Sequence, residues 1–533
     1  MRHARGHGRH SSQGARRMSA VGLLLLGLAL VLMMTTGWAT YAVLLAVSTL
    51  GALAGLALGA FDIAVLRSLP ERIVGLLEHD LLQALVLYAV VGALLNHLAL
   101  VGGLYSGLHK AIARLAGRRA ASEMAGLAVG MLLAPMNGSV GASLLTLSRT
   151  AGQAWAHEGM PPARRTALVA VASTLGIIVP PSLVLLLLGD AMLRAHTEGL
   201  ALAAQRGLAT AQAGTRIINT QDVLQAALAP GVMLLVLWLA VTWWLTRTAA
   251  PTTDTRHAPR GPLTRRERWT LVLVPTFIVA LLALVTTGQV RAVEAAATAG
   301  VLLLAWGVVS RQLTRQRLGQ VLDDALALTG ALFALLVAAV TFSLVLRAFG
   351  TDLLVADWMR ALQGQPLLAM AVVLAVLLGS AFVLDAFELI FLIIPIVMPP
   401  LLALVDDAAW VAALTLLVLQ AGFLLPPLGY ALVLARAQAA PRPAMAAVAR
   451  ALAPYLLSLL AVLALVLAVP ATTQWLRTTP ATLPETTIQG DDLDALMREM
   501  SQRPDDAPDA PENPGAPAAP DMPASATEKL QNQ

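Results

Sequence analysis

The chain has 533 residues, of which 58% are hydrophobic and 13% are charged, and its mean hydropathy is +0.74. Soluble domains carry about 25% charged residues, so this composition excludes a water-soluble globular protein and predicts that most of the chain lies in lipid. The net charge of +5 comes mainly from arginines in short connections, which orient membrane helices and do not indicate nucleic-acid binding, and the lack of cysteine excludes disulfides and thiolate chemistry.

Apolar runs long enough to cross a bilayer, which takes about 20 residues, recur along the chain. They predict an all-α polytopic membrane protein with about 10–12 transmembrane helices and two re-entrant helix hairpins. The expected spans or hairpins are 18–36, 39–60, 79–103, 122–148, 164–192, 226–247, 269–287, 293–310, 324–348, 366–405, 408–436 and 445–470.

The two ends differ from the predicted membrane transport domain, residues 18–470. Residues 1–17 form a basic N-terminal tail. The 18–36 run continues almost directly into the next apolar run, so we interpret it as a membrane helix and not as a signal peptide. Residues 471–533 form an acidic tail rich in Pro and Ala, and this composition predicts disorder.

The arginine-rich 248–268 connection is expected on the cytoplasmic side. Counting back from it, with 122–148 as a hairpin, puts the basic N-terminal tail outside. Either a span is miscounted or translation starts at Met18, and the sequence leaves both possibilities open.

Two segments, 61–78 and 104–119, mix charged and apolar residues. Each is interpreted either as a helix lying along the membrane plane or as an ordinary loop helix. The polar 194–225 stretch is interpreted as an external insertion.

The first predicted hairpin has a polar tip at Asn137–Ser143 between apolar arms that are too short to span a bilayer alone. A helix containing Pro180-Pro181 follows, and the two elements occupy about 122–192. The apolar run 366–405 is too long for one span and is interrupted at Asp385 and Glu388, which predicts a second hairpin. Pro426-Pro427 follows it, and this second pair of elements occupies about 366–436.

The repeated arrangement indicates a transporter. Proline removes a backbone donor, and the carbonyls it frees survive in a membrane only when they are buried in protein or line a wet cavity. Broken hydrophobic segments at matching places in two halves point to the binding site of a carrier. Hydroxyl and free carbonyl oxygens suit a small cation, and the N-termini of broken helices favour anionic groups. The alternative is a packing seam of small residues. The candidate ion- or substrate-binding residues are Asn137, Gly138, Ser139, Gly141, Ser143, Ser173, Thr174, Gly176, Pro180, Pro181, Ser182, Asp385, Glu388, Gln420, Pro426, Pro427 and Gly429.

Asp385 and Glu388 are the costliest residues of the membrane part, since an acid at the bilayer centre costs about 2.5–3.5 kcal/mol. If the helix is continuous there, the two acids share a face and could bind a cation or relay protons. The alternative is that they cap the hairpin tip through backbone N–H groups. No catalytic triad, metal-ligand spacing or nucleotide motif is present, so the sequence predicts neither an enzyme nor an ATP-driven pump.

With these motifs in this order, the chain resembles the large membrane subunit of tripartite ATP-independent periplasmic (TRAP) transporters, the DctM-like permeases. Within them it is most similar to the group assigned to mannitol or chloroaromatic compounds. The resemblance runs from about 40 to 470. The matching stretches are Gly59-Ala60-Phe61-Asp62, Leu69-Pro70-Glu71-Arg72-Ile73, Gly138–Ser143, Thr174-Leu175-Gly176, Pro180-Pro181-Ser182, Leu188-Gly189-Asp190, Glu294-Ala295-Ala296, Leu384-Asp385, Phe387-Glu388, Gln420, Phe423-Leu424, Pro426-Pro427 and Gly429.

The resemblance implies an inverted-repeat, elevator-type ion-transporter fold in the bacterial inner membrane, with no cofactor and with Na⁺ as the coupling ion. It also implies a small four-helix membrane subunit and a periplasmic solute-binding protein as partners, and a small organic anion as substrate. The first ion site would fall on Asn137–Ser143 and Ser173–Ser182, and the second near Asp385 and Gln420–Gly429.

The second half departs from the family pattern. Ala421-Gly422 and Leu425 stand where the family has hydroxyl side chains. Two alternatives therefore stay open: a carrier of the same fold that runs on protons or works without a binding protein, and a non-transporting membrane scaffold derived from that fold.

Overall fold

The computed structural model describes residues 7–77, 80–98, 100–133, 139–180, 182–205, 217–248 and 263–475. All regular secondary structure in these ranges is helical and none of it is strand, so the predicted all-α class is confirmed. Within them, seven helices are long and apolar enough to cross a membrane, or up to nine if each of two bent pairs is one span. Four shorter apolar helices are Ala120–Leu133, Pro366–Ser380, Ala386–Leu402 and Ala408–Leu424.

The N-terminal region forms six helices. They are α1 (His7–Thr36), α2 (Thr40–Ala57), α3 (Ile63–Arg67), α4 (Leu69–Leu77), α5 (Asp80–His97) and α6 (Leu100–Leu115). Both mixed segments are helices, as either interpretation of them requires. The predicted span 79–103 is not one helix, because α5 ends at His97 and α6 starts at Leu100.

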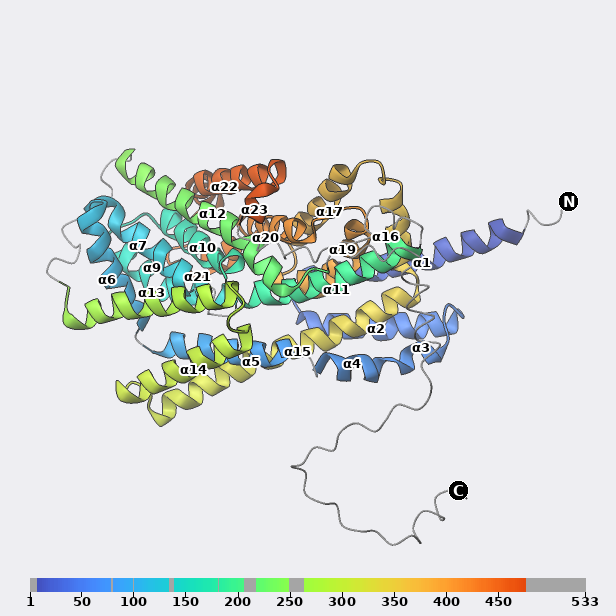
Figure 1. The fold of residues 1–533 in the computed structure, drawn as a ribbon, viewed down its shortest axis with the longest axis horizontal. Coiled ribbons are helices and arrows are strands. Elements are labelled where there is room, and N and C mark those ends of the chain that lie inside the picture. The colour runs from blue at the N-terminus through green and yellow to red at the C-terminus, as the bar shows by residue number, and fades with distance from the viewer. Residues whose placement is uncertain are drawn as a thin grey trace, which may run out of the picture. The chain divides into compact units, whose positions relative to one another are not determined.

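The middle of the chain forms five helices. They are α12 (Thr220–Thr248), α13 (Arg265–Thr286), α14 (Ala292–Val309), α15 (Arg315–Ala348) and α16 (Thr351–Arg360). A capping box fixes the start of α13: the Thr264 hydroxyl accepts from the Glu267 backbone N–H, and the Glu267 carboxylate accepts from that of Thr264. Helix α15 packs against α2 and α5, and α14 packs against α5, as Figure 1 shows.

The first predicted hairpin region and its Pro-Pro helix form five helices. They are α7 (Arg118–Leu133), α8 (Val140–Arg149), α9 (Ala151–His157), α10 (Pro162–Ile178) and α11 (Leu183–Gln205). The predicted external insertion 194–225 is only partly described, because residues 206–216 lie outside the described residues. Helix α11 continues to Gln205 and α12 starts at Thr220.

The second hairpin region and the C-terminal part form the remaining elements. They are α17 (Pro366–Ser380), α18 (Ala386–Glu388), the π-helix η3 (Leu389–Ile393), α19 (Ile394–Leu402), α20 (Ala408–Leu424), α21 (Tyr430–Gln438), α22 (Met445–Ala468) and α23 (Ala471–Gln474). Pro395 has no N–H to offer the carbonyl of Phe391, and the turn just before it is π-helical. The predicted disordered tail lies outside the described residues except for 471–475.

The two hairpin regions pack crosswise. Helix α8 of the first hairpin contacts α21, the second part of the other region's broken helix. Helices α18 and α19 of the second hairpin contact α11, the second part of the first broken helix. The first parts of the two broken helices, α10 and α20, contact each other. Each hairpin therefore rests on the broken helix of the opposite half.

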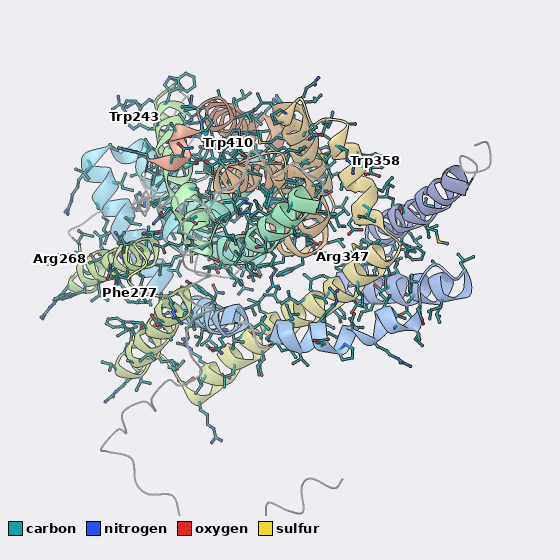
Figure 2. The ribbon with its side chains drawn as sticks, turned by 45° about the vertical axis from the view of Figure 1, so that its right-hand side comes forward. Trp243, Arg268, Phe277, Arg347, Trp358 and Trp410 are labelled. Atoms are coloured by element: carbon teal, nitrogen blue, oxygen red, sulfur yellow. The ribbon has the colours of Figure 1, made fainter. Side chains whose placement is uncertain are left out.

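Tryptophan side chains distinguish the inside of the bundle from its outer faces. Figure 2 shows Trp243 and Trp358 on the outside, and these side chains are exposed. Trp410 is buried, and its indole Nε1 donates to the backbone oxygen of Val466 at 2.8 Å, which ties α20 to α22. An indole N–H inside an apolar bundle needs such an acceptor, because leaving it unpaired is costly.

Candidate functional site

The first break in the chain separates α10 from α11 at residues 179–182, and the two helices are bent by 43° there. Pro180 is buried, whereas Pro181 lies outside the described residues. The Ser182 hydroxyl caps α11 by accepting a hydrogen bond from the Leu185 N–H at 3.4 Å. The first break is therefore a buried end of one helix followed by a capped start of the next.

The first hairpin joins α7 to α8, and its tip residues Asn137 and Gly138 lie outside the described residues. Ser139 caps α8, since its Oγ accepts from the Ala142 N–H at 3.1 Å. The Ser143 hydroxyl donates to the Ser139 carbonyl at 3.0 Å. A Cβ placed on Gly141 would lie 3.4 Å from the Tyr430 hydroxyl, so this end of α8 lies against the start of α21.

A polar contact joins the two broken helices deep inside the protein. Thr174 on α10 donates to the Val171 carbonyl at 2.9 Å and lies 3.5 Å from the Gln420 Nε2 on α20, which donates to it. Both side chains are fully buried. In the described part of the chain, the Gln420 Oε1 has no hydrogen-bond partner. A buried acceptor left unpaired costs about 1–3 kcal/mol, so this oxygen is available to a donor or a cation.

Two other residues of this cluster are buried without reaching across it. Ser173 donates to the Ala170 carbonyl at 2.8 Å within its own helix. Gly176 is buried near the end of α10. The lone pairs of the Ser173 hydroxyl remain available, because a hydroxyl accepts as well as donates.

The tip of the second hairpin contains the two predicted acids. The Asp385 Oδ1 accepts from the Glu388 N–H at 2.9 Å, and the Glu388 Oε2 accepts from the Asp385 N–H at 2.9 Å. The other Glu388 oxygen accepts from the Thr40 hydroxyl on α2. The condition under which the two acids would share a helix face is not met, because the helix is not continuous there and Asp385 precedes α18 as its N-cap. The capping alternative describes the geometry.

Tyr430, which sequence reasoning missed, lies between the second break and the first hairpin. It starts α21 immediately after Gly429, beside Gly141 of the first hairpin. Its ring lies at a tilt to that of Phe423 on α20, with the ring centroids 5.9 Å apart. Its place directly after the second Pro-Pro break is the signal that could have identified it.

The second break, at residues 425–429, is lined differently from the first. Pro426 is half-buried and Pro427 is exposed. A Cβ on Gly429 would lie 2.5 Å from the Phe423 carbonyl oxygen, so only glycine fits where the chain turns back on α20. Gly429 is thus required by the turn itself.

The site is rich in neutral oxygen atoms. Thr174 and Gln420 supply a hydroxyl and an amide oxygen where the two broken helices meet, and Ser139 and Ser143 supply hydroxyls at the start of α8. Among the described residues no group of three or more His, Cys, Asp or Glu side chains could hold a metal. Neutral oxygens at broken helices are the arrangement that membrane carriers use for monovalent cations.

The chain is similar to known transport proteins. The family model described as "Tripartite ATP-independent periplasmic transporter, DctM component" matches residues 21–472. The large permease protein DctM of a C4-dicarboxylate TRAP transporter from Pseudomonas aeruginosa is 26% identical over 426 residues, which cover 79% of this chain and 92% of that protein. Its counterpart from Rhodobacter capsulatus is 24% identical over 351 residues, which cover 65% of this chain and 76% of that protein.

Two further proteins extend the comparison. The sialic acid TRAP transporter permease SiaT of Haemophilus influenzae is 23% identical over 69% of this chain and 55% of its own length. The crystal structure of the YdaH transporter of Alcanivorax borkumensis superimposes with a TM-score of 0.53 at 18% identity, over 85% of this chain and 99% of that one. The latter likeness concerns the fold alone. The assignment to a mannitol or chloroaromatic group stays a prediction.

Proposed function

This chain belongs to the DctM-component family of tripartite ATP-independent periplasmic transporters, and we propose that it imports a small organic acid as the large membrane subunit of such a system, driven by Na⁺. The family is one of transporter permeases and not of enzymes. Together with its apolar helices, membership makes the chain a multi-pass protein of the bacterial inner membrane. The named relatives transport C4-dicarboxylates and sialic acid, which both bear carboxylates.

The observation that carries the proposal is the contact between Gln420 and Thr174. It lies where the two broken helices cross, and it leaves a buried amide oxygen available inside an apolar bundle. A buried oxygen without a partner destabilises a core that only has to pack. In a carrier the same oxygen can serve as a ligand for a cation that enters the site. Helix α8 packs on α10 and α17 packs on α20, so each hairpin lies against one of the two helices that make this contact.

An elevator motion is the mechanism we propose. The hairpins and broken helices form one packed group, and α2, α5, α14 and α15 form another. Among the described residues, the second hairpin is tied to α2 by the Thr40–Glu388 hydrogen bond. In the proposed cycle the first group moves against the second, and polar contacts of this kind between the groups break and re-form.

The proposed partners follow from the family. They are a small four-helix membrane subunit and a periplasmic solute-binding protein that delivers the organic anion. We propose no cofactor, and Na⁺ enters as the co-transported ion.

Uptake of labelled succinate into proteoliposomes tests this function. The protein is reconstituted with its small subunit, and the binding protein and an inward Na⁺ gradient are supplied or omitted independently. We expect uptake only when both are present. Uptake that is unchanged without the Na⁺ gradient would contradict sodium coupling, and uptake that follows a pH gradient would favour the proton-coupled alternative.

The non-transporting scaffold is the second candidate, supported by the loss of hydroxyl side chains at Ala421-Gly422 and Leu425. It predicts no uptake under any gradient even when all three components are present and the protein is folded. The two candidates are therefore separated by the same measurement.

A further inference from the structure

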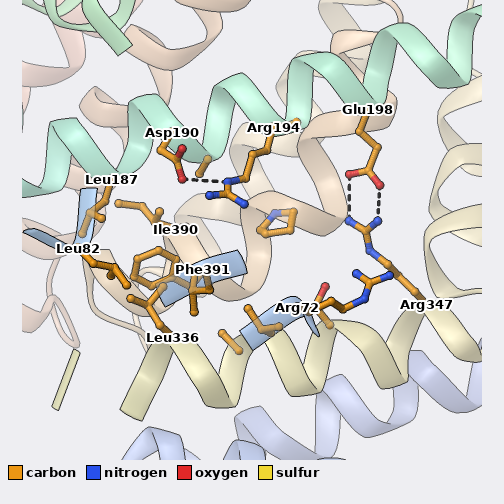
Figure 3. A pocket seen from close by; sticks show the side chains of 17 residues that line it. Arg72, Leu82, Leu187, Asp190, Arg194, Glu198, Leu336, Arg347, Ile390 and Phe391 are labelled. Carbon is orange, nitrogen blue, oxygen red and sulfur yellow. Dashed lines mark hydrogen bonds and ion pairs between the residues drawn. The ribbon is translucent and has the colours of Figure 1, made fainter. Parts of the chain in front are cut away.

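A cavity of about 220 Å³ lies between α11, η3 and α19 on one side and α4, α5 and α15 on the other. Apart from α4, these helices belong to the two groups that move against each other in the proposed cycle, so the cavity lies between the two groups. Figure 3 shows this cavity from close by. Its polar lining side chains are Arg72, Asp190, Arg194, Glu198, Ser343 and Arg347.

Ion pairs within the cavity neutralise two of its three guanidinium groups. The Arg194 Nε donates to Asp190 Oδ2 at 2.9 Å along α11. Arg347 on α15 forms a bidentate pair with Glu198 on α11, in which Nη2 donates to Oε2 at 2.9 Å. Both pairs are drawn in Figure 3.

Arg72 differs from these two arginines. In the part of the chain that the structure describes, no carboxylate pairs with this side chain, which projects from α4 into the cavity. Figure 3 shows the guanidinium groups of Arg72 and Arg347 turned into the same end of the cavity. Because Glu198 already pairs with Arg347, Arg72 carries the uncompensated positive charge at this end of the cavity, and an anion bound there would neutralise it.

The remaining wall is apolar. The π-helix and the start of α19 contribute Ile390, Phe391 and Pro395, and α15 contributes Leu336 and Val340. A ligand with a carboxylate at one end and a short hydrocarbon part at the other matches both surfaces. Drug-sized ligands occupy about 300–1,000 Å³, so this cavity suits a smaller molecule.

The cavity lies toward the outer end of the membrane part. Arg347 stands in the last turn of α15, whereas Arg315 and Arg317 stand at its start. The start of α15 follows the positive-inside pattern of a cytoplasmic end, so the opposite end with Arg347 faces outward. This is the side on which the proposed binding protein would release its cargo.

We propose that this cavity is a binding site for a short-chain carboxylate, in which the Arg72 guanidinium holds the carboxylate group beside Arg347. The site rests on the proposed function for its biological role, but its chemistry stands on the charge arrangement alone. A guanidinium fork binds a carboxylate through two parallel hydrogen bonds, which a lysine cannot reproduce. Arg347 stays paired with Glu198.

The absence of cysteine from the sequence makes the test direct. A Ser343→Cys variant carries the only thiol, and Ser343 lines the cavity. The full chain, in nanodiscs of phosphatidylcholine alone, is labelled with a charged thiol reagent at increasing succinate concentrations. Succinate is expected to slow the labelling, and the uncharged analogue 1,4-butanediol is not.

Adding Arg72→Gln to the Cys variant should raise the half-protective succinate concentration roughly 10- to 100-fold, the range of one charge-assisted hydrogen bond. The matched control is Arg67→Gln. Arg67 is an exposed arginine on the neighbouring helix α3 that does not line the cavity. If the thiol reacts poorly, the rise in melting temperature that succinate causes can be measured instead. It is compared between the cysteine-free chain and its Arg72→Gln and Arg67→Gln variants.

Three results would overturn the site: no protection or thermal shift with any carboxylate, an equal effect with and without Arg72, or protection only after an anionic lipid such as phosphatidylglycerol is added. The last result would identify a lipid headgroup as the occupant. Sodium-driven uptake without protection would remove this inference alone. Protection without uptake would support the cavity and contradict the proposed function.

Discussion

Gly422 on α20 lies so close to Ala381 beyond the end of α17 that a Cβ on the glycine would be 2.4 Å from the alanine Cβ. Two helices of a membrane protein approach this closely only through small residues. The glycine that replaces a family hydroxyl therefore has a packing role: it seats the second hairpin against the broken helix.

Gly422→Ala is expected to lower the thermal stability of the purified protein and to reduce uptake, because the added methyl group has no room. Overpacking of this kind costs about 1–3 kcal/mol. Ala381→Gly should restore most of the loss in the double variant. Gly379→Ala is the control, since nothing lies within 4 Å of a Cβ there. Equal effects of the two alanine substitutions would argue against the close contact.

Gln420→Leu is expected to abolish the Na⁺-dependent rise in melting temperature without lowering the melting temperature in Na⁺-free buffer. The sign follows from the unpaired Oε1, because removing a buried acceptor that lacks a partner relieves its desolvation cost. Thr415→Val on the same helix is the matched control, as the Thr415 hydroxyl donates to the Val411 carbonyl at 2.8 Å and has no other partner among the described residues. A Na⁺ response that survives in Gln420→Leu would show that this amide binds no cation.

Asp385→Asn should keep uptake within roughly threefold of wild type, whereas Asp385→Ala should lose about 1 kcal/mol of stability and most uptake. Asn caps helices about as well as Asp, and Ala does not. The measurements are thermal unfolding and uptake over a range of pH. Loss of uptake in a stable Asp385→Asn protein would mean that the charge itself is used. A pH profile unchanged by Asp385→Asn would count against proton relay through this residue.

Glu123→Ala is expected to be among the most destabilising single changes in the first hairpin region. The Glu123 side chain on α7 is 5% exposed, and Arg164 on α10 donates to it at 2.9 Å. Removing one partner of a buried pair costs about 3–5 kcal/mol, because the other charge is left unpaired.

The double variant Glu123→Ala/Arg164→Ala should recover part of that loss in thermal unfolding. Arg360→Ala serves as control, since Arg360 and Asp357 form an exposed pair at 3.3 Å within one helix and should change stability by a few tenths of a kcal/mol. Full additivity of the two single losses would indicate that the buried pair does not couple α7 to α10.

The sequence predicted the hairpins and breaks well because their signals are local. Arms too short to span and a proline pair within an apolar run are visible without any contact information. The dipeptide is not sufficient by itself, however. Pro399-Pro400 lies inside α19, and that helix continues past it to Leu402. The chain breaks at Pro180 and Pro426, unlike at Pro399-Pro400, because a new helix starts soon after each of them. Ser182 caps the first of these new helices, and Gly429 precedes the second.

The chemistry of the site was harder to predict because its contacts join distant residues. Thr40 and Glu388 are 348 positions apart, and Thr174 and Gln420 are 246 apart. No local pattern in the sequence predicts that one Glu388 oxygen accepts from the Asp385 N–H while the other accepts from Thr40 on α2. The pairing of Arg347 with Glu198, which are 149 positions apart, likewise has no local signal in the sequence.

The crosswise packing of α8 on α21 and of α11 on α19 means that neither half of the chain can fold alone as it folds here. A fragment that contains only the first half would expose the faces of α8 and α11 that the second half now covers. One half of this chain is therefore not a domain in its own right, because the two halves cover each other's apolar faces and fold as one unit.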